Sequence, residues 1–315
     1  MRVSVLIPTY RRPAQLAQAL ESLAWQDREL IGEILVGDDS PASLRAENEA
    51  VIAASAVADL VRYLPNEPAL GNYPNQWSLG AQARFDHIMI LHDDDQLQEG
   101  GLDVLVRACM TETDERVRIW FGKDVIMDAA GQIDPRRTVA NDVMYGKDGP
   151  SRALPAWDWC LSMSLPPDAS LIRRDAYVSM MRGERDGNVG DWGFHVRLAN
   201  SGAWGRFVAE AVSRYRVQPE SMTNRGLAVD VHYMYEIAKE LRVPPAREAD
   251  KNAVVRRFVE VATVRYMRHG EHRRAWRCFT SHDWRWPRRL SPRGVATIGM
   301  LLLPASLTQC AVIGA

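Results

Sequence analysis

Residues 88–95 read Ile-Met-Ile-Leu-His-Asp-Asp-Asp, so four apolar residues lead directly into a histidine and three carboxylates. The apolar half predicts a buried strand. Burying an unpaired carboxylate is costly, and three adjacent carboxylates also repel one another. A cation that prefers hard oxygen ligands, Mg²⁺ or Mn²⁺, would neutralise them. The alternative is a solvated acidic turn that ends the strand.

Upstream of this stretch, strand-like and helix-like patterns alternate. Short apolar runs predict strands at 3–7, 34–36, 61–64 and 87–91. Periodic apolar spacing predicts helices that begin at Pro13 and that cover about 42–58 and 74–84. Such alternation predicts a parallel sheet with helices on both faces.

Three polar clusters follow predicted strands, at residues 8–12, 38–40 and 92–95. In open α/β sheets, ligands bind beyond the carboxyl ends of the strands. Solvated turns would be equally common at either end of the strands. The convergence of the three clusters at one end therefore favours a binding site.

Beyond residue 100 the alternation breaks down. We expect a helix at 102–113 and separate strands at 117–121 and 125–127, followed by a loop-rich and mobile segment at 128–168. A strand at 171–172, a helix at 175–182, a helix beginning near Asp191 and closing strands at 204–208 and 215–217 complete this part.

Composition is typical of a globular protein, with 46% hydrophobic and 25% charged residues. The net charge of −1 hides an asymmetry, because residues 251–315 hold 12 Lys and Arg against 3 Asp and Glu. This basic stretch predicts an anionic partner. The four cysteines show no CxxC spacing and predict reduced thiols in the cytoplasm. The first apolar run is too short for a signal peptide and is expected to be a strand.

Five segments together resemble the family 2 glycosyltransferases of the GT-A fold. They are 3–12, 34–40, Asn66 with 70–72, 93–95, and 190–192 with 195–199. The resemblance covers roughly residues 1–225. It implies a Rossmann-like, mostly parallel sheet with helices on both faces, divided into a nucleotide-binding half (1–100) and an acceptor-binding half (101–225). Residues 226–315 are then expected to form a basic helical C-terminal extension.

The resemblance implies an inverting, metal-dependent glycosyltransferase of the hexosyltransferase type. The expected donor is a nucleotide-diphosphate sugar, UDP- or dTDP-linked, and the expected acceptor is a saccharide or lipid-linked hydroxyl in cell-surface polysaccharide or glycolipid synthesis. No nucleic acid partner is expected. A divalent cation would clamp the leaving diphosphate as its charge grows.

On the donor side, the resemblance implies that Asp94 and Asp95 hold Mn²⁺ or Mg²⁺ and that Asp93 and Asp94 lie near the ribose. Asp39 is expected to accept a hydrogen bond from the base, although an Asx-turn after the strand is an alternative. The wall around the base and ribose is assigned to Pro8, Thr9 and Tyr10. Arg11 is assigned to a phosphate, with a solvated surface side chain as the alternative.

On the acceptor side, Asp191 is the expected general base, because an inverting transfer needs a carboxylate opposite the leaving group. A helix N-cap is the structural alternative, and the two roles can coexist. Trp192 is expected either to stack on an acceptor sugar or to belong to the core.

Three positions depart from the family pattern. His92 stands where relatives often place the first Asp, Gly190 where they often place Glu, and Gln218 where they often place a His metal ligand. The metal site is therefore expected to depend on Asp94 and Asp95, with water and donor phosphates completing the shell.

The basic C-terminal stretch has a second pattern. Residues 248–280 are predicted to be helical, Trp and Arg recur through 276–289, and residues 294–315 carry no charge. Trp and Arg beside an uncharged stretch are typical of a membrane interface. We expect peripheral contact of 270–315 with the inner face of the cell membrane, with a helix packed on the enzyme or a membrane span as alternatives.

Two other functions compete with glycosyl transfer. A nucleotidyltransferase acting on sugar phosphates would favour a Gly-rich, Lys-bearing phosphate loop, and none stands between Pro8 and Leu20. A non-catalytic nucleotide-sugar-binding protein would be favoured by loss of Asp94, Asp95 or Asp191, and all three are present.

Overall fold

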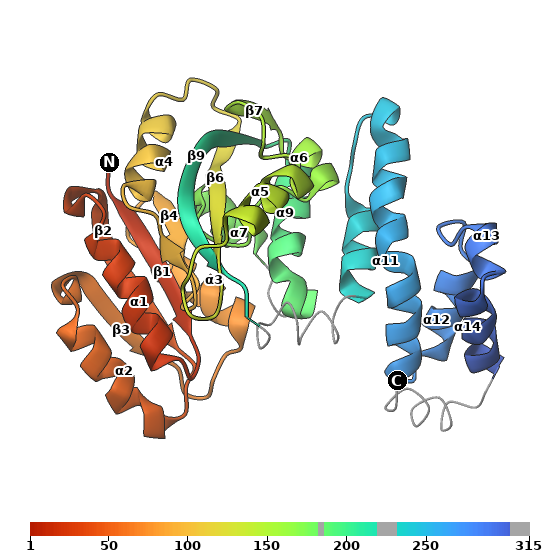
Figure 1. Cartoon of the computed structure of the whole chain (residues 1–315), viewed down its shortest axis with the longest axis horizontal. Coiled ribbons are helices and arrows are strands. Elements are labelled where there is room, and N and C mark those ends of the chain that lie inside the picture. The colour runs from red at the N-terminus through yellow and green to blue at the C-terminus, as the bar shows by residue number, and fades with distance from the viewer. Residues whose placement is uncertain (182–185, 219–231, 303–315) are drawn as a thin grey trace.

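The computed structural model describes residues 1–181, 186–218 and 232–302. Figure 1 shows a sheet wrapped by helices on one side of the molecule and a group of C-terminal helices on the other. The strand order in the sheet is β3-β2-β1-β4-β8-β6-β9-β5, and β7 pairs with β9. The α/β class and the helical C-terminal part are as predicted.

The first half of the sheet is parallel. Its strands, in spatial order, are β3 (Val61–Pro65), β2 (Ile31–Asp38), β1 (Val3–Thr9) and β4 (His87–Ile90). The connecting helices are α1 (Pro13–Ala24), α2 (Ala42–Ala54) and α3 (Asn72–Gln82). Every residue of β1 is buried, because helices cover both faces of a parallel sheet. The predicted elements of this half are confirmed.

The second half of the sheet is mixed. Its strands are β5 (Gln96–Leu97), β6 (Val117–Met127), β7 (Arg152–Pro155), β8 (Leu171–Arg173) and β9 (Trp204–Arg216). Strand β8 joins β4 and β6 in antiparallel register, whereas β6 and β9 run parallel to each other.

The prediction of two separate strands within 117–127, and of two within 204–217, is wrong. Strands β6 and β9 are each continuous. Lys123 and Asp124 interrupt the apolar pattern of β6, and such an interruption predicts two separate strands. Pairing instead continues through register shifts between Phe121 and Asp124, since a bulge accommodates the irregularity while the ladder resumes beyond it.

The segment 128–168 contains more regular structure than predicted, and its predicted mobility stays a prediction. This segment contains α5 (Pro135–Met144), β7 and α6 (Ala156–Ser162). Helix α5 begins at a cap, where Asp134 accepts a hydrogen bond from the backbone N–H of Arg137 at 3.0 Å. Helix α6 is anchored by buried Trp159, whose Nε1 donates to the Gly205 carbonyl at 2.9 Å.

The remaining helices complete both sides of the molecule. They are α4 (Gly101–Met110), α7 (Arg174–Met180), α9 (Gly190–Asn200), α11 (Glu248–Arg268), α12 (His272–Thr280), α13 (Trp286–Arg289) and α14 (Pro292–Leu302). One apolar core is continuous from the sheet, at Leu6 and Phe121, through Phe194 to Val255 and Phe279 of the C-terminal helices. The predicted domain boundary at 225 lies outside the described residues.

The C-terminal helices are short or polar. Within the described part of the chain, no helix combines the length and the apolar character that crossing a bilayer requires.

Candidate active site

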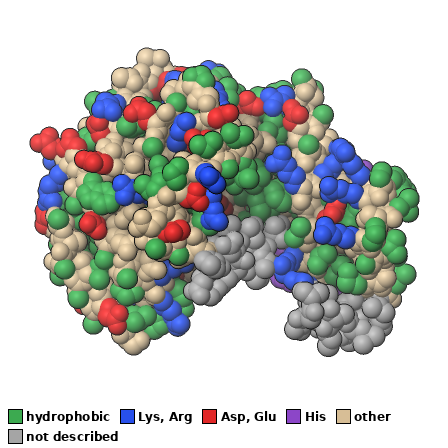
Figure 2. All heavy atoms as spheres, viewed as in Figure 1, with side chains coloured by type: hydrophobic (Ala, Val, Ile, Leu, Met, Phe, Trp, Pro, Cys, Tyr) green, Lys and Arg blue, Asp and Glu red, His purple; other side chains and the backbone are tan. Residues whose placement is uncertain are grey.

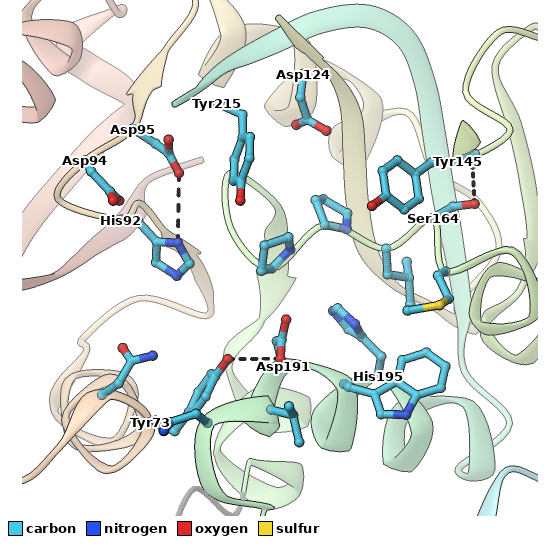
Figure 3. Close-up of a pocket in the computed structure, with 18 of the residues that line it drawn as sticks. Tyr73, His92, Asp94, Asp95, Asp124, Tyr145, Ser164, Asp191, His195 and Tyr215 are labelled. Carbon is cyan, nitrogen blue, oxygen red and sulfur yellow. Dashed lines mark hydrogen bonds and ion pairs between the residues drawn. The ribbon is translucent and has the colours of Figure 1, made fainter. Parts of the chain in front are cut away.

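A cavity of about 390 Å³ opens at the carboxyl ends of the parallel strands. The acidic stretch after β4 lines one wall, and the start of α9 with Asp191 lines the facing wall (Figure 3). Residues from β6, α5 and α6 close the third side. The acidic stretch therefore lies at this edge of the sheet, as predicted.

Three side chains of the acidic stretch form a possible cation site. Ligand atoms of His92, Asp94 and Asp95 lie within 4.8 Å of one another, and Figure 3 shows all three on one wall of the cavity. Burial, then the charges of Asp168 and Asp94, raises the pKa of Asp95 well above its usual value. Two carboxylates and an imidazole are a donor set that suits Mn²⁺ and related divalent ions. The residues present thus fit a divalent cation.

Asp93 plays a different part from its two neighbours. Its carboxylate accepts hydrogen bonds from Thr9 Oγ1 at 2.8 Å and from the Arg12 guanidinium at 3.0 Å. Arg12 also pairs with Asp94 at 2.7 Å. Burial works against the charge of Arg12, yet the two aspartates raise its pKa. Asp93 and Arg12 thereby fix the acidic stretch against the start of α1.

Arg216, at the end of β9, holds the same stretch from the other side. Its backbone N–H donates to Asp95 Oδ1 at 2.6 Å, and its guanidinium donates to the Asp94 carbonyl at 2.7 Å. Gln218 donates to Asp94 Oδ2 at 3.1 Å. Because these groups are donors, they orient the carboxylates and leave Asp95 Oδ2 facing His92 at 3.9 Å.

The other donor-side residues are placed as follows. Pro8 lines the cavity, and Thr9 is buried beneath Asp93. Tyr10 is half exposed, and the Arg11 guanidinium lies 5.0 Å from its ring centroid, outside the cavity that the described residues form. Asp39 accepts from Asn66 Nδ2 and from two backbone N–H groups of the 70–71 loop. Its predicted role toward a base stays a prediction.

Asp191 lies on the facing wall, in the first turn of α9. It accepts a hydrogen bond from Tyr73 Oη at 2.9 Å, an interaction drawn in Figure 3. Trp192 is buried at the cavity wall and donates through Nε1 to the Met234 carbonyl at 3.4 Å. Trp192 therefore belongs to the core and lines the cavity at the same time.

The Tyr73 ring leaves no room for a side chain at Gly190. A Cβ at this position would lie 2.5 Å from Cγ of the Tyr73 ring, which is closer than real Cβ contacts allow. The Tyr73 ring thus fills the space in which a glutamate at 190 would begin. The departure at Gly190 is explained by this contact.

A family model described as Glycosyl transferase family 2 matches residues 4–177, which is more than half of the 315-residue chain. The chain belongs to glycosyltransferase family 2. The predicted resemblance to this family is confirmed.

Solved structures of S. aureus TarS have the same fold. TarS 1–349 superposes with a TM-score of 0.58 at 16% identity, covering 96% of this chain and 80% of TarS 1–349. The complex of TarS 1–349 with UDP gives the same score and coverage at 17% identity, and its complex with UDP-GlcNAc does so at 15%. At this identity the likeness shows the fold, which is GT-A as predicted.

A curated relative matches a shorter part of the chain. The uncharacterized protein MT1568 of Mycobacterium tuberculosis is 34% identical over 105 residues. The match spans 33% of this chain and 31% of the relative, so about a third of each protein is compared.

Sequence reasoning missed several residues of the cavity. Arg12 adjoins the predicted Arg11, and only the structure distinguishes which of the two faces the carboxylates. Tyr73 reaches Asp191 across 118 residues of sequence. Lys147 is buried and pairs with Asp124 at 2.6 Å. A buried lysine inside a stretch of Gly, Asp and Pro carries no sequence signal, because its partner Asp124 lies far away in the sequence, on β6.

The contact between Gly190 and Tyr73 predicts an asymmetric response to alanine. Gly190→Ala should lower the free energy of unfolding by about 1–3 kcal/mol, because the added methyl group must displace a buried ring. Gly299→Ala, in α14 where a Cβ meets nothing within 4 Å, should raise it by up to about 1 kcal/mol. Urea unfolding measures both. Equal effects at the two positions would contradict this packing.

Proposed function

We propose that the protein transfers a sugar from a UDP- or dTDP-linked donor to an acceptor hydroxyl with inversion, assisted by Mn²⁺ or Mg²⁺. The observation that carries the proposal is the arrangement of one cavity, with His92, Asp94 and Asp95 on one wall and Asp191 on the other. An inverting displacement needs these two functions on opposite sides of the reacting carbon. The UDP and UDP-GlcNAc complexes of TarS support a nucleotide-sugar donor.

On the donor side, the acidic stretch would hold a divalent cation, which would supply positive charge where the diphosphate binds. Two anionic groups, the diphosphate and the carboxylates, repel each other unless a cation lies between them. When bound, the cation stabilises the charge that develops on the leaving diphosphate. Asp94 and Asp95 orient it, whereas Asp93 and Arg12 hold the loop. Pro8, Thr9, Tyr10, Arg11 and Asp39 form the nucleotide side, Asp39 toward the base.

On the acceptor side, Asp191 takes the proton from the acceptor hydroxyl. The hydrogen bond from Tyr73 fixes one carboxylate oxygen at 2.9 Å and leaves the other directed to the cavity. Trp192 gives the acceptor pocket an apolar face on which a sugar ring can stack. The acceptor is a saccharide or a lipid-linked saccharide of cell-surface polysaccharide or glycolipid synthesis.

We also propose peripheral contact with an anionic membrane surface at the cytoplasmic side, through α13 and α14. Several large apolar side chains here are strongly exposed, namely Trp286, Leu290, Val295 and Leu302. Exposed Arg285, Arg288 and Arg293 accompany them, and Figure 2 shows Lys and Arg side chains gathered on this side of the molecule. Apolar groups that insert and cations that attract anionic headgroups are the two requirements of interfacial binding. The predicted contact through 303–315 lies outside the described residues.

Nucleotide binding tests the donor assignment. With Mn²⁺ present, UDP or dTDP at a hundredfold excess over its Kd should stabilise the protein by about 2.7 kcal/mol, which raises the melting temperature measurably. GDP should shift it less, and EDTA should reduce the shift. A melting temperature that none of the three nucleotides changes would contradict the donor site.

Two tyrosine variants and one aspartate variant test the base. Asp191→Asn should lower kcat by about 10²–10⁴-fold while the UDP-induced thermal shift is kept. Tyr73→Phe should lower kcat by about 10–100-fold with little change in the donor KM, because a hydrogen bond to a carboxylate is worth about 1.5–3 kcal/mol. The assay is single-turnover transfer to a saccharide acceptor.

Tyr177→Phe is the matched control. Tyr177 is fully buried near the same helix, and its hydroxyl has no hydrogen-bond partner in the described structure. Its removal should leave kcat unchanged. If Asp191→Asn also abolished UDP binding, Asp191 would be a structural residue instead of the base.

Vesicle cosedimentation tests the membrane contact. The protein should bind phosphatidylglycerol vesicles, bind less as salt is raised, and bind phosphatidylcholine weakly. Replacing Trp286 and Leu290 with Ser should reduce binding at least several-fold. The control replaces Val139 and Met144 of α5, which are as exposed, and should leave binding unchanged. Equal binding by both double variants would contradict the proposal.

A further inference from the structure

Asp168 lies beside the cation-binding wall, at the end of the segment 128–168, and is not among the site residues that the sequence predicts. It directly precedes Ala169, whose backbone N–H donates to the Ile90 carbonyl at 2.7 Å, so the end of β4 holds it in place. Its side chain is 4% exposed. Within the described residues, its Oδ2 has no hydrogen-bond partner. An ionisable oxygen buried in this way is costly unless a ligand satisfies it.

His92 of the proposed cation site faces this oxygen. His92 Nδ1 lies 3.9 Å from Asp168 Oδ2 and 3.9 Å from Asp95 Oδ2. Both separations are too long for a hydrogen bond. They are, however, within the range of about 3–4.4 Å expected for two atoms that share one ion at bond lengths of about 2.1–2.2 Å. One oxygen of each carboxylate thus lies at the same distance from the same ring nitrogen.

The positively charged side chains nearby are paired with other carboxylates. Arg12 pairs with Asp93 and Asp94, and Lys147 pairs with Asp124. In the described part of the chain, the ion-pair contacts of Asp95 and Asp168 are with His92. Two buried carboxylates that share one imidazole therefore still lack a full positive charge.

We propose that Asp168 is a further ligand of the divalent cation and shares it with His92 and Asp95. This inference rests on the proposed function and extends its cation site by one residue. The set supplies a nitrogen and carboxylate oxygens from the protein alone, so the cation can bind before the donor. Because imidazole is a poor ligand for Mg²⁺ and a good one for softer divalent ions, the site prefers Mn²⁺ over Mg²⁺.

Asp168→Asn tests the inference, since it keeps the shape of the side chain and removes its charge. Mn²⁺ alone, without nucleotide, is titrated into the full-length protein and followed by electron paramagnetic resonance. The Kd for Mn²⁺ should rise by at least about 10-fold in the variant. In EDTA the variant should melt no lower than the wild type, because the repulsion between Asp168 and Asp95 is gone. The rise in melting temperature on adding Mn²⁺ should shrink.

Asp186→Asn is the matched control. Asp186 is equally buried, but it pairs with Arg197 at 2.5 Å. This variant should melt lower in EDTA and in Mn²⁺ alike and should bind Mn²⁺ as the wild type does. An unchanged Kd in Asp168→Asn, or a melting temperature that falls equally in EDTA and in Mn²⁺, would overturn the inference. So would a wild type that binds no Mn²⁺.

The failure of this inference and of the proposed function can be separated. If the wild type binds both Mn²⁺ and UDP while Asp168→Asn behaves identically, the role of Asp168 alone is rejected. If the wild type binds neither Mn²⁺ nor UDP, the donor site itself is rejected.

Discussion

The repulsion among buried carboxylates at the end of β4 is the constraint on which the rest of the site depends. Asp93, Asp95 and Asp168 are each at least 95% buried, and burial raises the pKa of all three. Folding alone does not remove this cost. The chain offsets part of it with Arg12 and with the backbone N–H of Arg216, and a divalent cation would offset the remainder. The site is thus built in the folded protein before any substrate arrives.

The wall of the cavity formed by α9 has a different role. A general base has to face the cation across the substrate and keep one fixed orientation. In the proposed mechanism Asp191 is that base. The Tyr73 hydroxyl donates to its carboxylate, and Gly190 leaves space for the Tyr73 ring. Positions 73 and 190 are therefore coupled.

The parallel half of the fold could be predicted from sequence because its information is local. Runs such as 3–7 and 87–91 are apolar on both faces, and the ligand-binding edge follows from topology. The predicted break in β6 is wrong because Lys123 and Asp124, which interrupt its apolar pattern, have tertiary partners that the sequence does not reveal. Asp134 is a residue type favoured at helix N-caps, but the turn residues around it favour a loop, so the sequence did not predict α5. The contacts of Asp168 and Tyr73 are with residues far away in the sequence, so the sequence alone did not predict them.

The measurement that tests this account most directly is anomalous diffraction from crystals soaked in Mn²⁺. The account predicts a peak at the end of β4, within bonding distance of Asp95 and His92, on the wall that faces Asp191. A soaked crystal in which this space holds no peak, with Arg12 still the partner of Asp94 and manganese bound elsewhere or nowhere, would contradict it.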